Sequence, residues 1–230
     1  MAESLTFDAF LFDMDGTILT SIPAVERAWT AWADRIGAPA EDVLHYLHGR
    51  PARDTIARFA PQGADIPAEV AWLDAREMED LDGIAAIAGA ADLLAALPAD
   101  RWAVVTSANR ALAERRIAAA GLPAPPLLIS SDDVRRGKPH PEGYLRAARH
   151  LGFGPARCLV FEDTAAGLQA GRAAGAQVIH VLGTPGVGGS GALASITGYL
   201  DLEVKPGPDG LWLGFASGAP QGDQRGAGRA

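Results

Sequence analysis

Short apolar runs alternate with helical patterns along most of this chain. Five runs rich in Phe, Val, Leu and Ile occur, at residues 9–12, 102–105, 126–130, 158–161 and 177–183. Runs of this length that are apolar throughout are typical of strands buried on both faces of a parallel sheet. Helical spacing of apolar residues follows three of them, at residues 111–122, 141–153 and 164–175. The alternation predicts an α/β fold: a doubly wound parallel sheet with a Rossmann-like core.

Residues 20–86 interrupt this alternation with helical patterns and no strand signal. Three helices are predicted there, at residues 23–37, 52–60 and 68–84. In the first, Val25, Trp29, Trp32 and Ile36 share one face, so we expect both tryptophans in a small hydrophobic core. The pattern predicts a helical domain inserted between the first two strands, which leaves residues 1–19 and 87–216 as a discontinuous α/β core.

The C-terminal part carries weaker signals. Residues 202–215 read as a two-stranded hairpin around a Pro-Asp-Gly turn. The Gly-rich stretch 183–192 lacks the Gly-Lys-Ser/Thr ending of a phosphate-binding loop, so we assign it no such role. Residues 217–230 contain few apolar side chains and are predicted to be a disordered tail.

Composition narrows the class of protein. The chain has 230 residues, 48% of them hydrophobic, a net charge of −8 and a pI of about 5.1, which argues against nucleic acid or an anionic membrane as the main partner. It has no run of 18 apolar residues and no basic N-terminal segment followed by an apolar one. A single cysteine, Cys158, excludes an internal disulfide and reads as a buried apolar residue. We expect a soluble cytoplasmic protein, with a monomer favoured.

Candidate chemistry begins where the first strand ends. Asp13 and Asp15 follow the run at residues 9–12, and Gly16 then breaks it. Residues two apart on a strand face the same way, so both carboxylates can approach one point. An ordinary solvated Asp-x-Asp-Gly turn is the alternative.

Three further strand ends carry polar groups. Thr106 and Ser107 follow the second strand and offer hydroxyl and N–H groups to a phosphate, although either could instead cap the next helix. Lys138 lies in the loop after the third strand and could bind phosphate there. The alternative is that it is an ordinary surface lysine. Glu162 and Asp163 end the fourth strand. The alternative is that they are acids at the N-terminus of the next helix, where the helix dipole favours negative charge.

Ligands of open parallel sheets bind at the carboxyl ends of the strands, so these groups are expected to meet. Carboxylates from two strand ends can hold Mg²⁺ together with water and a substrate phosphate. The hydroxyls and the lysine can neutralise phosphate oxygens, and one further carboxylate is free to attack phosphorus. The constellation indicates a magnesium cofactor and a small phosphorylated metabolite as partner.

Four segments, "DMDGT", "VVTSANR", "GKPHPEGY" and "VFEDTAAGLQAG", resemble the four ordered motifs of the haloacid dehalogenase superfamily. The insert resembles the cap of its C1-type members. The segments "SIPAVERAWTAWA" and "HGRPARDTI" resemble the branch of sugar phosphatases and glycerol-3-phosphatases. The resemblance covers residues 6 to about 183 and implies Mg²⁺-dependent hydrolysis of small phosphorylated sugars or polyols.

The resemblance also implies residue roles. Asp13 would be the nucleophile that forms an aspartyl-phosphate, and Asp15 the general acid and then base. Thr106, Ser107 and Lys138 would bind the transferring phosphoryl group. The implied metal ligands are Asp13, the backbone carbonyl of Asp15, Glu162 and Asp163.

Substrate recognition is expected in the insert. His48 and Arg50 are the candidates for contacts with the leaving group, with solvent-facing helix-end residues as the alternative. The acids Glu77, Glu79 and Asp80 read as a solvated helix face rather than cleft residues. Two other functions stay open: a β-phosphoglucomutase-like phosphotransferase and a non-catalytic binding module on the same fold.

Overall fold

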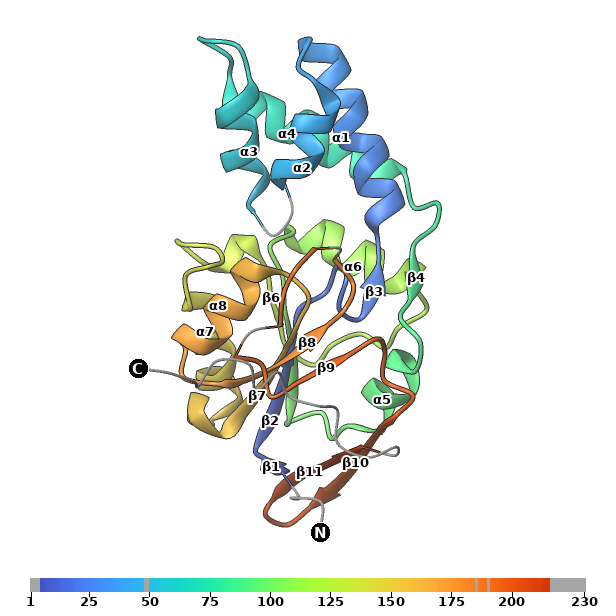
Figure 1. The fold of residues 1–230 in the computed structure, drawn as a ribbon, viewed down its shortest axis with the longest axis vertical. Coiled ribbons are helices and arrows are strands. Elements are labelled where there is room, and N and C mark those ends of the chain that lie inside the picture. Colours follow the sequence, from blue (N-terminus) through green and yellow to red (C-terminus); the bar gives the residue numbers. More distant parts are fainter. Residues whose placement is uncertain (1–4, 48–49, 185, 190, 216–230) are drawn as a thin grey trace, which may run out of the picture.

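The computed structural model describes residues 5–47, 50–184, 186–189 and 191–215 (Figure 1). Its centre is a six-stranded sheet in the order β6-β5-β2-β7-β8-β9, in which every neighbouring pair is parallel. The strands are β2 (Ala9–Phe12), β5 (Trp102–Val105), β6 (Leu128–Ile129), β7 (Cys158–Glu162), β8 (Gln177–Val181) and β9 (Ala194–Ile196). The predicted doubly wound parallel sheet is confirmed.

Helices cover both faces of this sheet, which is why its strands are apolar on both sides. Residues of α5 (Ala90–Ala96) and α6 (Arg110–Ala119) pack against Phe10, Phe12 and Phe161 on one face. On the other face, α7 (Glu142–Leu151) and α8 (Ala165–Ala173) pack against Leu11 and Val160. The alternating side chains of β2 and β7 thus belong to two separate hydrophobic clusters.

Four helices form a layer beyond the carboxyl end of the sheet (Figure 1): α1 (Ile22–Ile36), α2 (Ala40–Leu47), α3 (Ala52–Phe59) and α4 (Ile66–Glu79). They enclose a third hydrophobic cluster, in which Trp29 and Trp32 are buried as expected. Two short strands, β3 (Leu19–Thr20) and β4 (Ala85–Ala86), pair antiparallel where the chain leaves and re-enters the α/β part. The helical layer is therefore joined to the sheet through two adjacent segments.

A second sheet lies at the opposite end of the molecule (Figure 1). It consists of β1 (Leu5–Phe7), β11 (Gly210–Phe215) and β10 (Leu202–Gly207), in the antiparallel order β1-β11-β10. The predicted hairpin at residues 202–215 is confirmed, and β1 adds a third strand to it. Two 3₁₀ turns, η1 (Ser131–Asp133) and η2 (Pro155–Arg157), complete the elements.

Several elements differ from the sequence-based expectation. The elements that were not predicted are helices α2 and α5 and strands β1, β3, β4 and β9, and the strand expected at residues 126–130 shortens to β6. The helix expected to end at residue 84 ends at Glu79. The predicted disordered tail, residues 217–230, lies outside the described residues.

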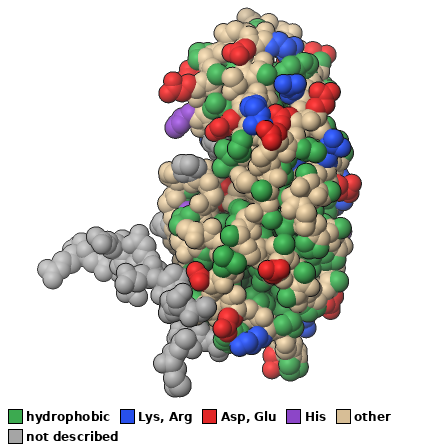
Figure 2. All heavy atoms as spheres, turned by 90° about the vertical axis from the view of Figure 1, so that its right-hand side faces the viewer, with side chains coloured by type: hydrophobic (Ala, Val, Ile, Leu, Met, Phe, Trp, Pro, Cys, Tyr) green, Lys and Arg blue, Asp and Glu red, His purple; other side chains and the backbone are tan. Residues whose placement is uncertain are grey.

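Acidic and basic side chains are interspersed over the helical layer on the face shown in Figure 2. Within the described part of the chain, no helix is long and apolar enough to cross a lipid bilayer. Cys158 is buried, as expected, and burial raises the pKa of its thiol to about 11.

Candidate active site

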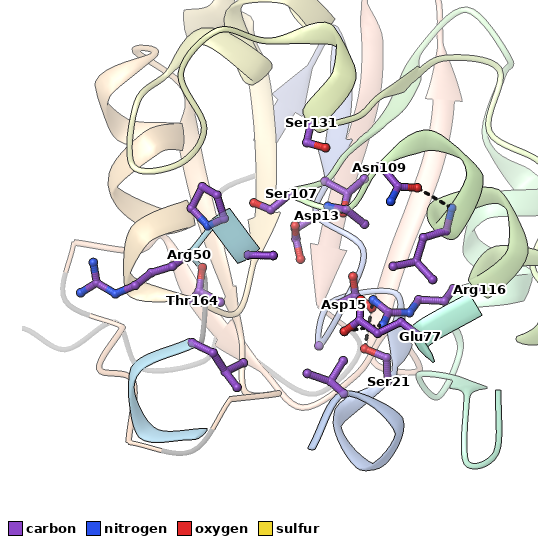
Figure 3. Close-up of a pocket in the computed structure, with 18 of the residues that line it drawn as sticks. Asp13, Asp15, Ser21, Arg50, Glu77, Ser107, Asn109, Arg116, Ser131 and Thr164 are labelled. Carbon is purple, nitrogen blue, oxygen red and sulfur yellow. Dashed lines mark hydrogen bonds and ion pairs between the residues drawn. The ribbon is translucent and has the colours of Figure 1, made fainter. Parts of the chain in front are cut away.

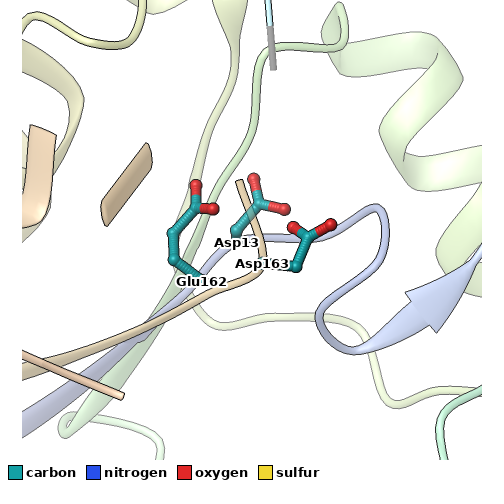
Figure 4. A group of neighbouring side chains, drawn as sticks. All are labelled: Asp13, Glu162 and Asp163. Atoms are coloured by element: carbon teal, nitrogen blue, oxygen red, sulfur yellow. The ribbon is translucent and has the colours of Figure 1, made fainter. Parts of the chain in front are cut away.

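Three carboxylates meet at the carboxyl ends of two neighbouring strands. Asp13 follows β2, Glu162 ends β7 and Asp163 follows it, and β2 and β7 are paired in parallel. One oxygen of each acid lies within 4.8 Å of the others, and all three side chains are buried. Figure 4 shows the three carboxylates gathered over the strand ends. The sheet topology therefore brings together the acids that the sequence placed at successive strand ends.

Two glycines leave room for these acids. Gly16 has φ of +81°, and a Cβ atom there would lie 2.1 Å from Oδ2 of Asp163. A Cβ atom at Gly167, in the first turn of α8, would lie 1.7 Å from Oε1 of Glu162. A larger residue at either position would displace a carboxylate.

Lys138 is the cation at this centre. The loop after β6 carries it into the sheet edge, where its buried ammonium donates to Asp13 and, at 2.6 Å, to Oε1 of Glu162. Burial alone would lower the pKa of Lys138, but the charges of Asp13 and Glu162 raise it well above its ordinary value. Lys138 is therefore a buried ammonium ion rather than the surface lysine of the alternative reading.

Glu162 has all its acceptor positions in use. Its Oε1 accepts from Lys138 and from the hydroxyl of Tyr144 at 3.1 Å. Its Oε2 accepts from the N–H of Thr164 at 2.9 Å and from its hydroxyl at 3.0 Å. A carboxylate offers about four lone-pair positions, so the Glu162 carboxylate is held in one orientation.

Asp163 and Asp13 carry unfavourable buried charge. Burial and the nearby Glu162 raise the pKa of Asp163 to about 7, although the Thr184 and Thr17 hydroxyls donate to it. Burial also raises the pKa of Asp13, against the favourable charge of Lys138. When all three buried acids are ionised, they and Lys138 together carry an excess of two negative charges, which a divalent cation would balance. The all-oxygen donor set suits a hard ion of the Mg²⁺ or Ca²⁺ type.

Thr106 and Ser107 lie at the end of β5 and line the same cavity as Asp13 (Figure 3), which has a volume of about 290 Å³. The hydroxyl of Thr106 accepts from the N–H of Ala108 at 3.1 Å. Neither residue caps α6, because the side chain of Asn109 caps it by accepting from Leu112. The helix-capping alternative for Thr106 and Ser107 is therefore wrong.

Asp15 points into the cavity beside Asp13 but has different partners (Figure 3). It accepts from the hydroxyl of Ser21 and, at 3.1 Å, from Nη1 of Arg116. Arg116 comes from α6 and is buried, although no sequence motif singled it out. Its other terminal nitrogen, Nη2, lies 3.5 Å from Oε1 of Glu77.

Glu77 corrects the expectation of a solvated acidic helix face. It lies on α4, is 8% exposed and lines the cavity, because α4 packs against α6 and turns this side chain toward Arg116. Burial raises its pKa to about 7. Glu79 and Asp80 follow the expectation better, since neither lines the cavity. Glu77 alone of the three acids is a cleft residue.

The two predicted recognition residues have different outcomes. His48 lies outside the described residues. Arg50 lines the cavity and is exposed, and its guanidinium stacks on Tyr46 of the same helical layer, 4.3 Å from the ring centroid. In Figure 3 this guanidinium points away from Asp13 and Asp15.

The sequence is similar to that of known proteins over most of its length. A family model for haloacid dehalogenase-like hydrolases matches residues 7–175. Hexitol phosphatase A of Escherichia coli is 45% identical over 75% of this chain and 82% of its own length. Glycerol-1-phosphate phosphohydrolase 1 of Saccharomyces cerevisiae is 36% identical over 79% of this chain and 77% of its own length.

The fold has a matching solved structure. The crystal structure of CbbY from Rhodobacter sphaeroides in complex with phosphate superposes with a TM-score of 0.73 at 26% identity, covering 84% of this chain and 95% of CbbY. The family resemblance noted in the sequence is thus confirmed. The chain belongs to the haloacid dehalogenase-like hydrolases.

Proposed function

We propose that this hydrolase is a Mg²⁺-dependent phosphatase of small phosphorylated sugars or polyols. The observation that carries the proposal is the buried cluster of Asp13, Glu162 and Asp163 around Lys138, in a cavity also lined by Thr106 and Ser107. The names of the two similar curated proteins, a hexitol phosphatase and a glycerol-1-phosphate phosphohydrolase, support the substrate class.

Asp13 and Asp163, with the backbone carbonyl of Asp15, are the proposed metal ligands. Glu162 is the third side-chain candidate, although direct ligation would require it to give up one of its four hydrogen bonds. When bound, Mg²⁺ would neutralise charge on the phosphate, which otherwise repels an attacking carboxylate.

Asp13 is the proposed nucleophile. A carboxylate oxygen of Asp13 forms a bond to phosphorus while the bond from phosphorus to the alcohol oxygen breaks. Lys138, which contacts Asp13, favours the ionised form of that carboxylate against the effect of burial and offers its charge to the phosphoryl oxygens. The hydroxyls of Thr106 and Ser107, which line the same cavity, are the proposed donors to the same oxygens.

Asp15 is the proposed general acid and base. Its proton passes to the departing alcohol oxygen, and it then takes a proton from the water that attacks phosphorus and releases Asp13. Ser21 and Arg116 hold its carboxylate in place. One group can serve both steps because the first step leaves it deprotonated.

The helical layer is the proposed cap, within residues 20–86, over a core of residues 1–19 and 87–216. Cavity residues come from both parts, for example Trp29 and Val70 from the cap and Leu112 from the core. Closure of the cap would exclude water and strengthen the electrostatic interactions at the phosphate. Arg50 is retained as a candidate for contact with the leaving group.

A panel of phosphate esters tests the proposal. Purified protein with Mg²⁺ is assayed for inorganic phosphate release from sugar phosphates, polyol phosphates and an aryl phosphate. In parallel, bisphosphate-dependent isomerisation of glucose 1-phosphate is followed. Phosphate release without isomerisation is the expected result. Isomerisation without net release would favour a phosphotransferase, and neither activity would favour a non-catalytic binding module.

A further inference from the structure

Helix α4 of the cap lies against helix α6 of the core through polar contacts. Four residues that face the cavity at this junction are called the α4–α6 seam: Asp74, Glu77, Asn109 and Arg116. Arg116 pairs with Glu77, and Asp74 lies close enough to Asn109 and Arg116 for both to lower its pKa against the effect of burial. Asn109 lies in the segment "VVTSANR", directly after the proposed phosphate-binding residues, whereas Asp74, Glu77 and Arg116 lie outside all four motif segments.

Arg116 has hydrogen-bonding capacity that the protein does not use. Its side chain is 4% exposed, yet within the described part of the chain neither Nε nor Nη2 has a hydrogen-bond partner. The approach of Nη2 to Glu77 is an ion pair at 3.5 Å rather than a hydrogen bond. Buried donors without partners are unfavourable and rare, so these two N–H groups point to a missing acceptor.

The seam lies where the leaving group should extend. Asp13 and Ser107 mark the phosphate end of the cavity, and Asp15 stands between them and Arg116 and Glu77 (Figure 3). Since Asp15 is the proposed donor to the leaving oxygen, the rest of the alcohol continues past it toward the seam.

We propose that the α4–α6 seam binds the hydroxyl groups of the leaving alcohol. Hydroxyl oxygens would accept from Nε and Nη2 of Arg116, and hydroxyl protons would be donated to Glu77 and Asp74. This inference rests on the proposed phosphatase function and adds a recognition site on helices α4 and α6 to the expected one around Arg50.

Charge balance selects the class of alcohol. The single guanidinium of Arg116 already faces the carboxylates of Asp15 and Glu77, with Asp74 nearby. No positive charge is left at the seam to bind a second phosphate or a carboxylate. The seam therefore fits an uncharged polyhydroxylated leaving group.

Two neighbouring arginines provide a matched test. Arg116 lines the cavity, whereas Arg115 is exposed and holds the same two helices together by donating from Nε to the carbonyl of Met78 at 2.6 Å. The variants Arg116→Met and Arg115→Met are compared on sorbitol 6-phosphate and on hexyl phosphate, which has the same chain length without the hydroxyls. The measured quantity is the ratio of the two kcat/KM values, because effects through Asp15 act on both substrates.

The ratio is expected to fall roughly 10- to 100-fold in Arg116→Met and to stay within about twofold of wild type in Arg115→Met. Glu77→Gln, a nearly isosteric change, should lower the ratio as well and serves if Arg116→Met does not fold. An unchanged ratio in the folded variants would overturn the inference while leaving the phosphatase function intact. Efficient wild-type turnover of sorbitol 1,6-bisphosphate would also overturn it. Absence of phosphate release from any ester by wild type would instead overturn the proposed function, and the inference with it.

Discussion

The ammonium of Lys138 lies 2.6 Å from Oε1 of Glu162, and the same ammonium contacts Asp13. Asp13 follows β2, Glu162 ends β7 and Lys138 lies in the loop after β6, so the contact depends on how these strands are arranged in the sheet. Glu162 in turn accepts from Tyr144 and Thr164, which fixes the lysine beside the proposed nucleophile. The packing of the sheet therefore determines where the positive charge of Lys138 lies in the site.

Replacing Asp13 with Asn should abolish turnover, because an amide is a poor nucleophile and lacks the charge of a metal ligand. The fold should survive, since the side-chain shape is nearly unchanged and burial already disfavours the charged form of Asp13. Steady-state assays on an aryl phosphate, with thermal unfolding as the control for folding, check this. Wild-type-like turnover from a clean preparation of Asp13→Asn would remove the nucleophile assignment.

Replacing Asp15 with Ala should slow both the departure of the alcohol and the hydrolysis of the intermediate. General acid–base catalysis typically contributes about 10²–10⁴-fold. The loss should be largest with alkyl phosphates, whose leaving oxygen needs a proton, and smaller with an aryl phosphate. A loss below about threefold with an alkyl phosphate would count against the role.

Glu77 should make the free energy of unfolding depend on pH. Its pKa is raised by burial from 4.5 to about 7, with Arg116 opposing and Asp15 and Asp74 reinforcing the shift. Between these pH values the folded state holds a proton that the unfolded state has lost, so Glu77 lowers stability as pH rises. Glu77→Gln has no ionisable group at this position and therefore lacks this pH-dependent contribution to the free energy of unfolding.

The stability of Glu77→Gln relative to wild type should therefore increase from pH 4.5 to pH 7, by on the order of 3 kcal/mol. Urea unfolding of both proteins at several pH values in metal-free buffer measures the difference. Parallel curves over this range would show that the pKa of Glu77 is not raised.

Arg50→Ala tests the recognition residue predicted from the sequence. Arg58 is the matched control, because it stacks on the same Tyr46 ring, at 4.7 Å from the centroid, but does not line the cavity. Losing one hydrogen-bonding partner of the leaving group should cost roughly 1–3 kcal/mol of transition-state binding. Values of kcat/KM on a sugar phosphate, glycerol 3-phosphate and an aryl phosphate check this.

The aryl phosphate should be least affected by Arg50→Ala, and Arg58→Ala should leave the relative values unchanged. Equal losses on all three substrates would mean that Arg50 does not read the leaving group.

Local patterns were sufficient to predict much of the sheet and the residues at its edge. Asp13 and Asp163 were found because short apolar runs mark buried strands, and polar residues directly after parallel strands lie at one edge of the sheet. Lys138 lies farther along the loop after β6 and was singled out by its position between Gly137 and Pro139 and by the motif resemblance. Strand β9 was not predicted, because its three residues, Ala194–Ile196, follow a Gly-rich stretch and are identified as a strand only by their pairing with β8. Strand β1 is likewise defined by pairing with β11, more than 200 residues away in the chain.

Arg116 and Glu77 show what local patterns cannot reveal. Each lies on a helix whose sequence contains other charged residues, and nothing in either segment marks one of them as buried. Their burial follows from the packing of α4 on α6, which brings together residues 39 positions apart. Such a pair can be identified only from the three-dimensional structure.

The most direct test of the account is the metal dependence of phosphate release from a hexitol phosphate. Wild-type protein is assayed with Mg²⁺, with excess EDTA, and with EDTA followed by excess Mg²⁺. We expect release in the first condition, loss of release in the second and recovery in the third, because the buried acids Asp13 and Asp163 need a divalent cation to bind a phosphate dianion. Equal rates with and without EDTA would contradict it.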